Sequence, residues 1–312
     1  MKSQQSTTGS TAQSTAAPHA LCGIPTIKTW RRMYMKKFLA MLSCAVLMAA
    51  TAVGCGSQND KITVISREDG SGTHSAFSEL MGVVKDEKDN TLATAEITGS
   101  TSVMLTTVSG NQAAIGYVSL GSLNDTVKAV KVDGVEATAE NVKAGKYAVS
   151  RPFNIVTGND LTPLAQDFIT YMLSADGQAI VEEKGYISVS QGEAYKAAGQ
   201  TGTLTIAGST SVAPLMEVLA DKYMALNTGV QIEIQQSGSS AGITSTIEGV
   251  CQIGMSSREL KDSETAKGVS ATRIAMDGIA VIVNKDNSCT DLTSEQIRQI
   301  YTGEITQWSA IQ

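Results

Sequence analysis

The sequence predicts an α/β protein whose folded part forms two lobes. From about residue 60 to the end of the chain, short apolar runs alternate with helix-like patterns, which is typical of α/β architecture. Residues 55–312 are more than a single layer of secondary structure requires, and they are enough to form two lobes. Residues 188–202 are small and polar, so we expect them to form a linker.

Residues 1–54 differ from this folded part. Residues 1–30 are rich in Ser, Thr, Ala and Gln and show no periodicity, and a basic segment followed by a short apolar one leads to Cys55. The apolar segment is too short to span a membrane comfortably. We therefore expect a disordered leader plus a lipoprotein signal peptide, with Cys55 as the lipidated first residue. An uncleaved anchor or a chance cysteine are the alternatives, and both leave the body outside the cytoplasm.

The charge and the cysteines restrict the partners. Of the 24 basic side chains six lie in residues 1–54, leaving 18 against 30 acidic ones, which disfavours nucleic acid as a ligand. Cys251 and Cys289 are the only cysteines after Cys55, and His74 is the only histidine there, so we expect neither a metal nor another cofactor. The two thiols form one disulfide or stay buried and free.

One strand–loop–helix unit, residues 62–80, has the composition of an anion site. A short apolar strand ends at Arg67, and the loop Asp69-Gly70-Ser71-Gly72-Thr73 leads into a helix. Backbone N–H groups at the helix start, two hydroxyls and a guanidinium would converge on one point, which suits a small oxyanion. Asp69 is expected to cap the turn, to hold Arg67 or to accept a proton, and His74 to lie exposed in the first helical turn.

Two further hydroxyl-rich loops precede helices, at Ser209-Thr210-Ser211 and at Ser239-Ser240. The bland interpretation is that these residues only cap helices and that Arg67 pairs with an acidic neighbour at the surface. Three such loops together with Arg67 favour a ligand site. Arg258, which follows Ser257, ranks below Arg67, and the segment 99–101 is interpreted as a plain helix cap.

The remaining elements follow from local signals. Apolar runs predict strands at 114–118, 153–156, 203–206, 230–234 and 279–283, the last fully buried. Helix caps are expected at Thr162, Ser174 and Thr293. The site offers many donors and few proton acceptors, so we predict binding and not catalysis. The alternative is a secreted phosphate-ester hydrolase that uses Ser71 or Ser209 as its nucleophile.

The motifs of residues 60–312 resemble those of the phosphate-binding lipoproteins of bacterial phosphate ABC transporters. The resemblance rests on the following segments: ISREDGSGTHSAF, AGSTSVAPL, QSGSSAG, IGMSSREL, DGIAVIVN, IYTGEITQW and AIGYVSLG. It implies a two-lobed periplasmic-binding-protein-like fold with hinge strands and a ligand cleft that closes on phosphate.

The resemblance also implies a circularly permuted order. In the family the AGSTSV segment comes first and SREDGSGT follows IYTGEITQW, whereas here SREDGSGT comes first. The first lobe would combine 60–125 with 285–312, residues 126–149 would be a connector or hinge, and 150–284 would form the second lobe. A rearranged gene is the alternative explanation of this order.

The family pattern assigns the phosphate ligands residue by residue. It places Thr210, Ser211 and Ser239 on one lobe, and Arg67, Ser71, Gly72 and Thr73 on the other; Asp69, Ser209 and Ser257 are secondary candidates. Some family members have an aspartate at the position of Ser257, which leaves the preference for phosphate over sulfate open. The expected protein is a monomer, lipid-anchored to the membrane, that delivers phosphate to permease subunits; sulfate, molybdate or tungstate are the alternative ligands.

Overall fold

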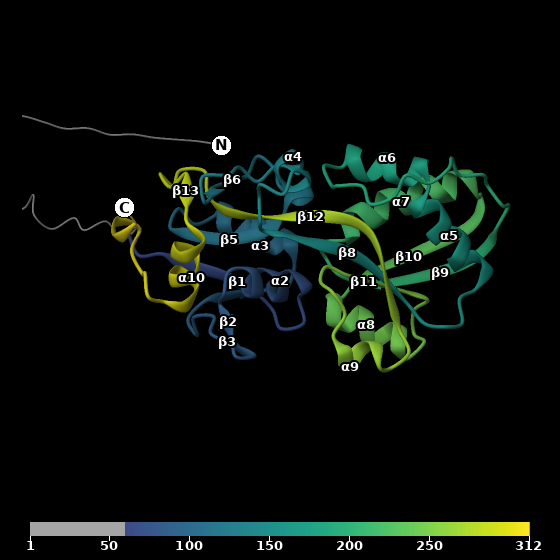
Figure 1. Ribbon diagram of the computed structural model, residues 1–312, viewed down its shortest axis with the longest axis horizontal. Coiled ribbons are helices and arrows are strands. Elements are labelled where there is room, and N and C mark those ends of the chain that lie inside the picture. The colour runs from purple at the N-terminus through teal and green to yellow at the C-terminus, as the bar shows by residue number, and fades with distance from the viewer. Residues whose placement is uncertain (1–59, 312) are drawn as a thin grey trace, which may run out of the picture. The chain divides into compact units, whose positions relative to one another are not determined.

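The computed structural model describes residues 60–311, and Figure 1 shows their arrangement as a ribbon. The expected leader, signal peptide and lipidation of Cys55 lie outside these residues. Among the described helices, none has both the length and the apolar character that crossing a bilayer requires.

A nine-stranded sheet runs through the described residues in the order β10-β9-β11-β8-β12-β5-β1-β4, with β6 also paired to β12. Its strands are β1 (Thr63–Arg67), β4 (Glu96–Thr98), β5 (Ala114–Ser119), β6 (Val127–Ala129), β8 (Ser150–Thr157), β9 (Thr201–Gly208), β10 (Gly229–Gln236), β11 (Ile253–Ser256) and β12 (Ser270–Asn284). Strands and helices alternate along the chain, so the predicted α/β class is confirmed.

The first lobe is built on β1, β4 and β5. Its helices are α2 (Gly72–Leu80), α3 (Thr101–Ser109), α4 (Ala139–Lys143) and α10 (Ser294–Thr302). Two small ribbons join it, β2 (Val84–Lys85) with β3 (Lys88–Asp89), and β7 (Lys131–Val132) with β13 (Asp291–Leu292). Phe77 of α2 and Met104 of α3 lie in separate buried clusters, so these two helices cover different faces of the sheet.

The second lobe is built on β9, β10 and β11 together with β8. Its helices are α5 (Pro163–Leu173), α6 (Ala175–Glu183), α7 (Ala213–Leu226), α8 (Ser239–Ile247) and α9 (Asp262–Thr265). The expected caps are confirmed: the hydroxyls of Thr162 and Ser174 accept from the first turns of α5 and α6, and Thr293 caps α10 in the first lobe.

Strand β12 connects the two lobes. Its residues 270–278 pair with β8, and its residues 279–283, the expected buried strand, pair with β5. Residues 126–149, expected as a connector, instead pack into the first lobe, where Val130, Tyr147 and Val149 are buried beside Val281 and Val283. The chain therefore crosses between the lobes along β12, which pairs with strands of both, and also where Val149 of the first-lobe core leads into β8.

The two ends of the described chain lie side by side. The Ile62 amide donates to the Thr306 carbonyl at 2.9 Å, and the Trp308 amide donates to the Asp60 carbonyl at 2.8 Å. The expected linker has no helix or strand before Thr201, where β9 begins. It is nevertheless held to the second lobe, since the Tyr195 hydroxyl donates to Asp167 at 2.6 Å.

Candidate functional site

Two helices begin at predicted site residues, and a third begins at Thr101, which was not predicted as a site residue. Gly72, Thr101 and Ser239 are the first residues of α2, α3 and α8, and the loop 209–211 leads into α7. Each helix N-terminus carries unpaired N–H groups and about half a positive charge. The contacts of these residues decide whether the four segments form one site.

A first group of hydroxyls joins the lobes. The Thr73 and Ser211 hydroxyl oxygens are 2.8 Å apart. The Thr101 hydroxyl oxygen lies 3.1 Å from that of Ser211 and 3.3 Å from that of Thr210. All four residues are buried. Hydroxyls can donate or accept, so such a group can turn its protons toward an anion.

Arg67 completes this group. Its Nη2 donates to the Thr210 hydroxyl at 3.0 Å, across the boundary between the lobes. Its Nε and Nη2 also bind both carboxylate oxygens of Glu68, at 2.7 and 2.8 Å, and the Arg67 side chain is 2% exposed. Arg67 is therefore not a surface ion pair, although it has a carboxylate partner.

The carboxylate that holds Arg67 is Glu68 and not Asp69. Asp69 is exposed, so the expectation that it holds Arg67 is wrong. The reason is geometric: β1 ends at Arg67, and Asp69 already belongs to the turn that Gly70 makes with a φ of 86°. This turn keeps the carboxylate of Asp69 in solvent.

A second group of hydroxyls surrounds Gly72. The Ser257 hydroxyl oxygen accepts from that of Ser209 at 2.9 Å and lies 3.3 Å from that of Ser239. A Cβ atom on Gly72 would lie 2.7 Å from the Ser257 hydroxyl oxygen and closer still to that of Ser239. The absence of a side chain at Gly72 is thus what allows α2 to approach these serines.

Ser71 and Arg258 lie at the edges of this arrangement. Ser71 is buried and caps α2, accepting from the His74 amide at 3.3 Å. Arg258 binds both carboxylate oxygens of Glu264, at 2.7 and 2.8 Å, and its Nη2 donates to the Ser240 hydroxyl at 3.1 Å. Arg258 is therefore held within the fold by Glu264, and it stays a weaker ligand candidate than Arg67.

Sequence reasoning missed Thr101 and misplaced His74. Ser100 does cap α3 as expected, by accepting from Val103 N at 3.2 Å, but the next side chain, Thr101, enters the first hydroxyl group. The string GSTSV occurs at residues 99–103 and again at 208–212, and this repeat was the signal that could have identified Thr101. The imidazole of His74 was expected in solvent, yet His74 is 8% exposed because Asp89, Tyr117 and Ser66 bind its ring.

Neither Ser71 nor Ser209 forms a serine–histidine pair with the ring of His74. The His74 ring has no contact with the hydroxyl of Ser71, and the Ser209 hydroxyl donates to Ser257. Within residues 60–311 no group of three or more His, Cys, Asp or Glu is placed to hold a metal ion. Cys251 and Cys289 are free, and burial raises the pKa of both thiols.

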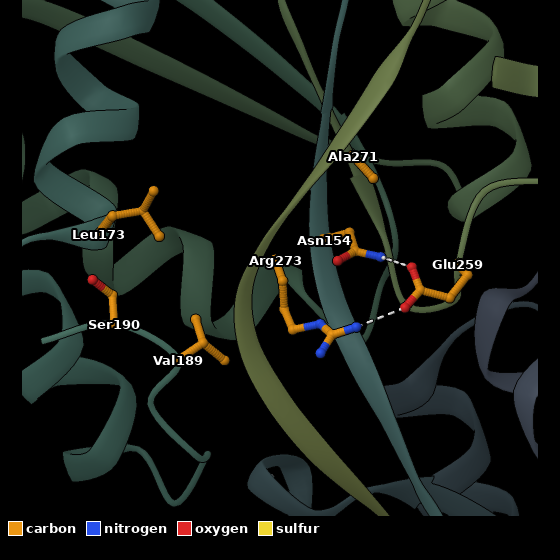
Figure 2. A pocket seen from close by; sticks show the side chains of 7 residues that line it. All are labelled: Asn154, Leu173, Val189, Ser190, Glu259, Ala271 and Arg273. Carbon is orange, nitrogen blue, oxygen red and sulfur yellow. Dashed lines mark hydrogen bonds and ion pairs between the residues drawn. The ribbon is translucent and has the colours of Figure 1, made fainter.

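A surface pocket of the second lobe, drawn in Figure 2, is separate from this site. Glu259 in its wall accepts from the Asn154 amide at 3.1 Å and from Arg273 at 2.8 Å. None of the predicted ligand residues lines it. This pocket is therefore not the predicted ligand site. The predicted ligand residues instead contact one another directly.

The fold and these loops belong to a known class of protein. The model of the PBP superfamily domain matches residues 6–176 and 193–311, so the chain is a member of this superfamily. It is 49% identical over 289 residues to "Phosphate-binding protein PstS 2" of Streptococcus agalactiae, covering 89% of this chain and 99% of that protein. It is 43% identical over 290 residues to the protein of that name from Streptococcus pneumoniae, covering 88% and 99%.

A solved structure agrees with these relatives. The crystal structure of a phosphate ABC transporter, phosphate-binding protein from Streptococcus pneumoniae TIGR4, matches with a TM-score of 0.66 and 44% identity, covering 81% of this chain and all of that one.

Proposed function

We propose that this protein binds inorganic phosphate outside the cytoplasm and delivers it to an ABC-type importer. The observation that carries the proposal is the contact of buried Arg67 with Thr210, because it joins a guanidinium of one lobe to a helix-start hydroxyl of the other. The names of the streptococcal relatives support phosphate as the ligand.

The proposed ligand set is built from the two groups of hydroxyls described above. It consists of Arg67, Ser71, Gly72 and Thr73 of the first lobe and Thr210, Ser211 and Ser239 of the second, with Ser209 and Ser257 as secondary members. Hydroxyl and amide donors at helix N-termini neutralise an anion without full charges, and Arg67 supplies the main formal countercharge. The exposed position of Asp69 removes it from the proposed set.

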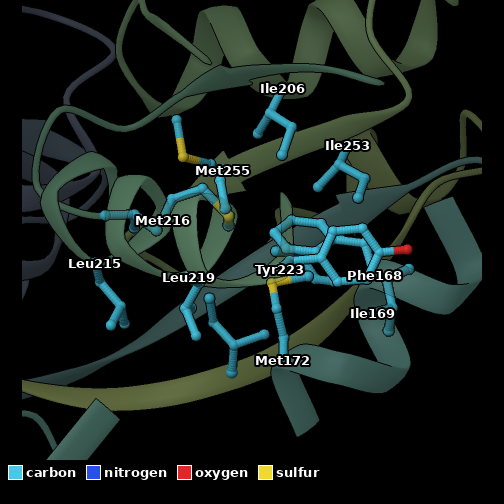
Figure 3. Packing of buried hydrophobic residues seen from close by; sticks show 14 of the residues in the cluster. Phe168, Ile169, Met172, Ile206, Leu215, Met216, Leu219, Tyr223, Ile253 and Met255 are labelled. Carbon is cyan, nitrogen blue, oxygen red and sulfur yellow. The ribbon is translucent and has the colours of Figure 1, made fainter. Parts of the chain in front are cut away.

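The lobes are proposed to close on the ligand about the strands β8 and β12. Each lobe has a buried core of its own, and Figure 3 shows that of the second lobe, where Phe168, Met172 and Tyr223 pack together. Packed cores move as units, so the motion is expected where strands cross between them. Closure would be the signal that the permease subunits recognise.

Titration calorimetry tests the proposal directly. Wild-type protein should bind phosphate, and Arg67→Ala should weaken binding by about tenfold or more, since a charge-assisted contact is lost. Arg273→Ala is the control, because Arg273 is a half-exposed arginine of the second lobe paired with Glu259. No heat with wild-type protein, or an unaffected Arg67→Ala variant, contradicts the proposal.

Other tetrahedral oxyanions are the second candidate ligands. Neither of the two groups of hydroxyls includes a carboxylate, so neither contains a group that can only accept a proton from phosphate. Competition of sulfate, molybdate and tungstate with phosphate in calorimetry separates these ligands. A hydrolase is disfavoured, because His74 binds Asp89 and Tyr117; phosphate-ester turnover that disappears in Ser71→Ala would reinstate it.

The location and the segment order are parts of the same proposal. The mature protein is proposed to be a monomer held to the membrane by lipid on Cys55, which incorporation of labelled palmitate and its loss in Cys55→Ala would test. The order of segments is proposed to be a circular permutation of the order that the resemblance implies. Support comes from the adjacent chain ends, where Lys61 forms an antiparallel bridge with Gln307, because new ends must lie close together.

A further inference from the structure

A polar network, buried except for Asp89 at its outer end, lies next to the proposed ligand site, and none of its hydrogen-bonding side chains belongs to the ligand set. It consists of Asp89 on β3, His74 on α2, Tyr117 on β5 and Ser66 on β1. The His74 Nε2 lies 2.5 Å from an Asp89 carboxylate oxygen, and its Nδ1 lies 3.0 Å from the Tyr117 hydroxyl. The network is thus continuous from the β2–β3 ribbon to the middle of the sheet.

Tyr117 connects this network to Arg67. The backbone N–H of Arg67 donates to the Tyr117 hydroxyl oxygen at 3.2 Å, and the Ser66 hydroxyl lies 2.9 Å from the same oxygen. The Tyr117 ring stacks on Phe77, with centroids 4.0 Å apart and 14° between the planes. Since the ring is fixed, its hydroxyl holds the backbone of Arg67 in one place.

The hydrogen bonds of this network fix its protons. Burial alone pushes the pKa of Asp89 upward, but hydrogen bonds from Thr91 and His74 outweigh burial and keep it below its ordinary value. Asp89 is therefore a carboxylate, which only accepts, so His74 Nε2 donates to it. The Arg67 N–H only donates. In neutral His74, Nδ1 accepts from a hydroxyl; that of Tyr117, at 3.0 Å, is the nearest, and that of Ser66 lies at 3.2 Å. Tyr117 keeps its proton because burial raises its pKa.

We propose that Tyr117 and His74 are positioning residues of the ligand site, and that the Tyr117 hydroxyl, held by His74 Nδ1, keeps Arg67 in its binding position. This inference rests on the proposed function, because it concerns the same site. It predicts that residues without contact to the ligand determine the affinity for the ligand.

Three variants test the proposal by calorimetric titration of the purified protein with inorganic phosphate. Tyr117→Phe removes the acceptor for Arg67 N–H and should weaken binding roughly tenfold. His74→Gln keeps a donor near Asp89 but offers Tyr117 no acceptor at the Nδ1 position, so a similar loss is expected. His74→Asn places an amide oxygen near the Nδ1 position without a titrating group, and should stay within about twofold of wild type at pH 8.

The contrast between the two His74 variants separates positioning from folding. Both remove the ring, but only His74→Asn restores an acceptor near the Tyr117 hydroxyl, so His74→Asn should bind phosphate several-fold more tightly than His74→Gln. Tyr147→Phe is the control, because its buried hydroxyl donates to the Ile279 carbonyl at 2.8 Å, away from the site; phosphate affinity should be unchanged.

Two results would overturn the inference: a Tyr117→Phe protein that unfolds cooperatively and binds phosphate as wild type does, or equal phosphate affinities of His74→Gln and His74→Asn. If wild-type protein itself does not bind phosphate, the proposed function fails first, and the two failures are therefore distinguishable. If Tyr117→Phe does not fold, the comparison of His74→Gln with His74→Asn decides.

Discussion

The hydroxyl oxygens of Thr101 and Thr210 lie 3.3 Å apart, although 109 residues separate them in the chain. Each is the third residue of a GSTSV string, the first beginning at Gly99 and the second at Gly208. Thr101 is the first residue of α3, whereas Thr210 belongs to the loop before α7. The two lobes therefore meet at this point through the same short sequence.

Replacing Thr101 by Val tests its membership of the site. The substitution keeps the branched shape but removes the hydroxyl that lies between Ser211 and Thr210, so phosphate affinity should fall about three- to tenfold. Calorimetric titration measures the change. Thr106→Val on the exposed side of the same helix should leave affinity unaltered. Equal affinities of the two variants would remove Thr101 from the site.

Replacing Gly72 by Ala tests the approach of the lobes. A Cβ there would collide with the hydroxyls of Ser239 and Ser257, so phosphate affinity should fall by about tenfold or more. Gly99→Ala is the matched control, since nothing lies within 4 Å of a Cβ at Gly99. Tight binding by Gly72→Ala would mean that α2 does not approach Ser239 in the bound form.

Replacing Ser257 by Asp tests selectivity. A buried carboxylate accepts a proton from phosphate but meets only lone pairs on sulfate, so the ratio of phosphate to sulfate affinity should rise by about tenfold or more. Competition titration at pH 7 gives this ratio. Ser240→Asp adds the same charge at the edge of the site and should change it little. An unchanged ratio in Ser257→Asp would place the ligand away from residue 257.

The ion pair of Arg258 with Glu264 predicts a pH-dependent stability. Burial pushes the pKa of Glu264 up, but hydrogen bonds and charge from Arg258 outweigh it and hold this pKa below the ordinary 4.5. A carboxyl whose pKa is lower in the folded state stabilises the fold above that range and loses this contribution as the pH falls. Glu264→Gln should cost about 1–3 kcal/mol at pH 7, because Arg258 is left buried without its carboxylate.

Chemical denaturation at two pH values measures this effect. The difference in unfolding free energy between wild type and Glu264→Gln should shrink as the pH is lowered below about 4, where Glu264 itself becomes protonated. Glu295→Gln is the control, since Glu295 is exposed in its pair with Arg298 and its loss should change the unfolding free energy little. A constant difference across this range would contradict the assignment.

Local chemistry was readable from the sequence. Thr162, Ser174 and Thr293 cap their helices as expected, because capping depends on residues three positions apart. The loop 69–73 and the serines before α7 and α8 are predicted to bind an anion, because hydroxyls and glycine at helix starts suit that chemistry whatever surrounds them. The α/β class followed from the alternation of strands and helices.

Only the tertiary structure decided which of these residues meet. Nothing local distinguishes Thr101 from an ordinary first helical residue, and it joins the site because α3 begins opposite the Thr210 loop. His74 follows the anion loop directly, yet Asp89 and Tyr117 draw its ring into the interior. Contacts between distant segments depend on how strands are ordered in the sheet, and a helix-start pattern carries no record of that order.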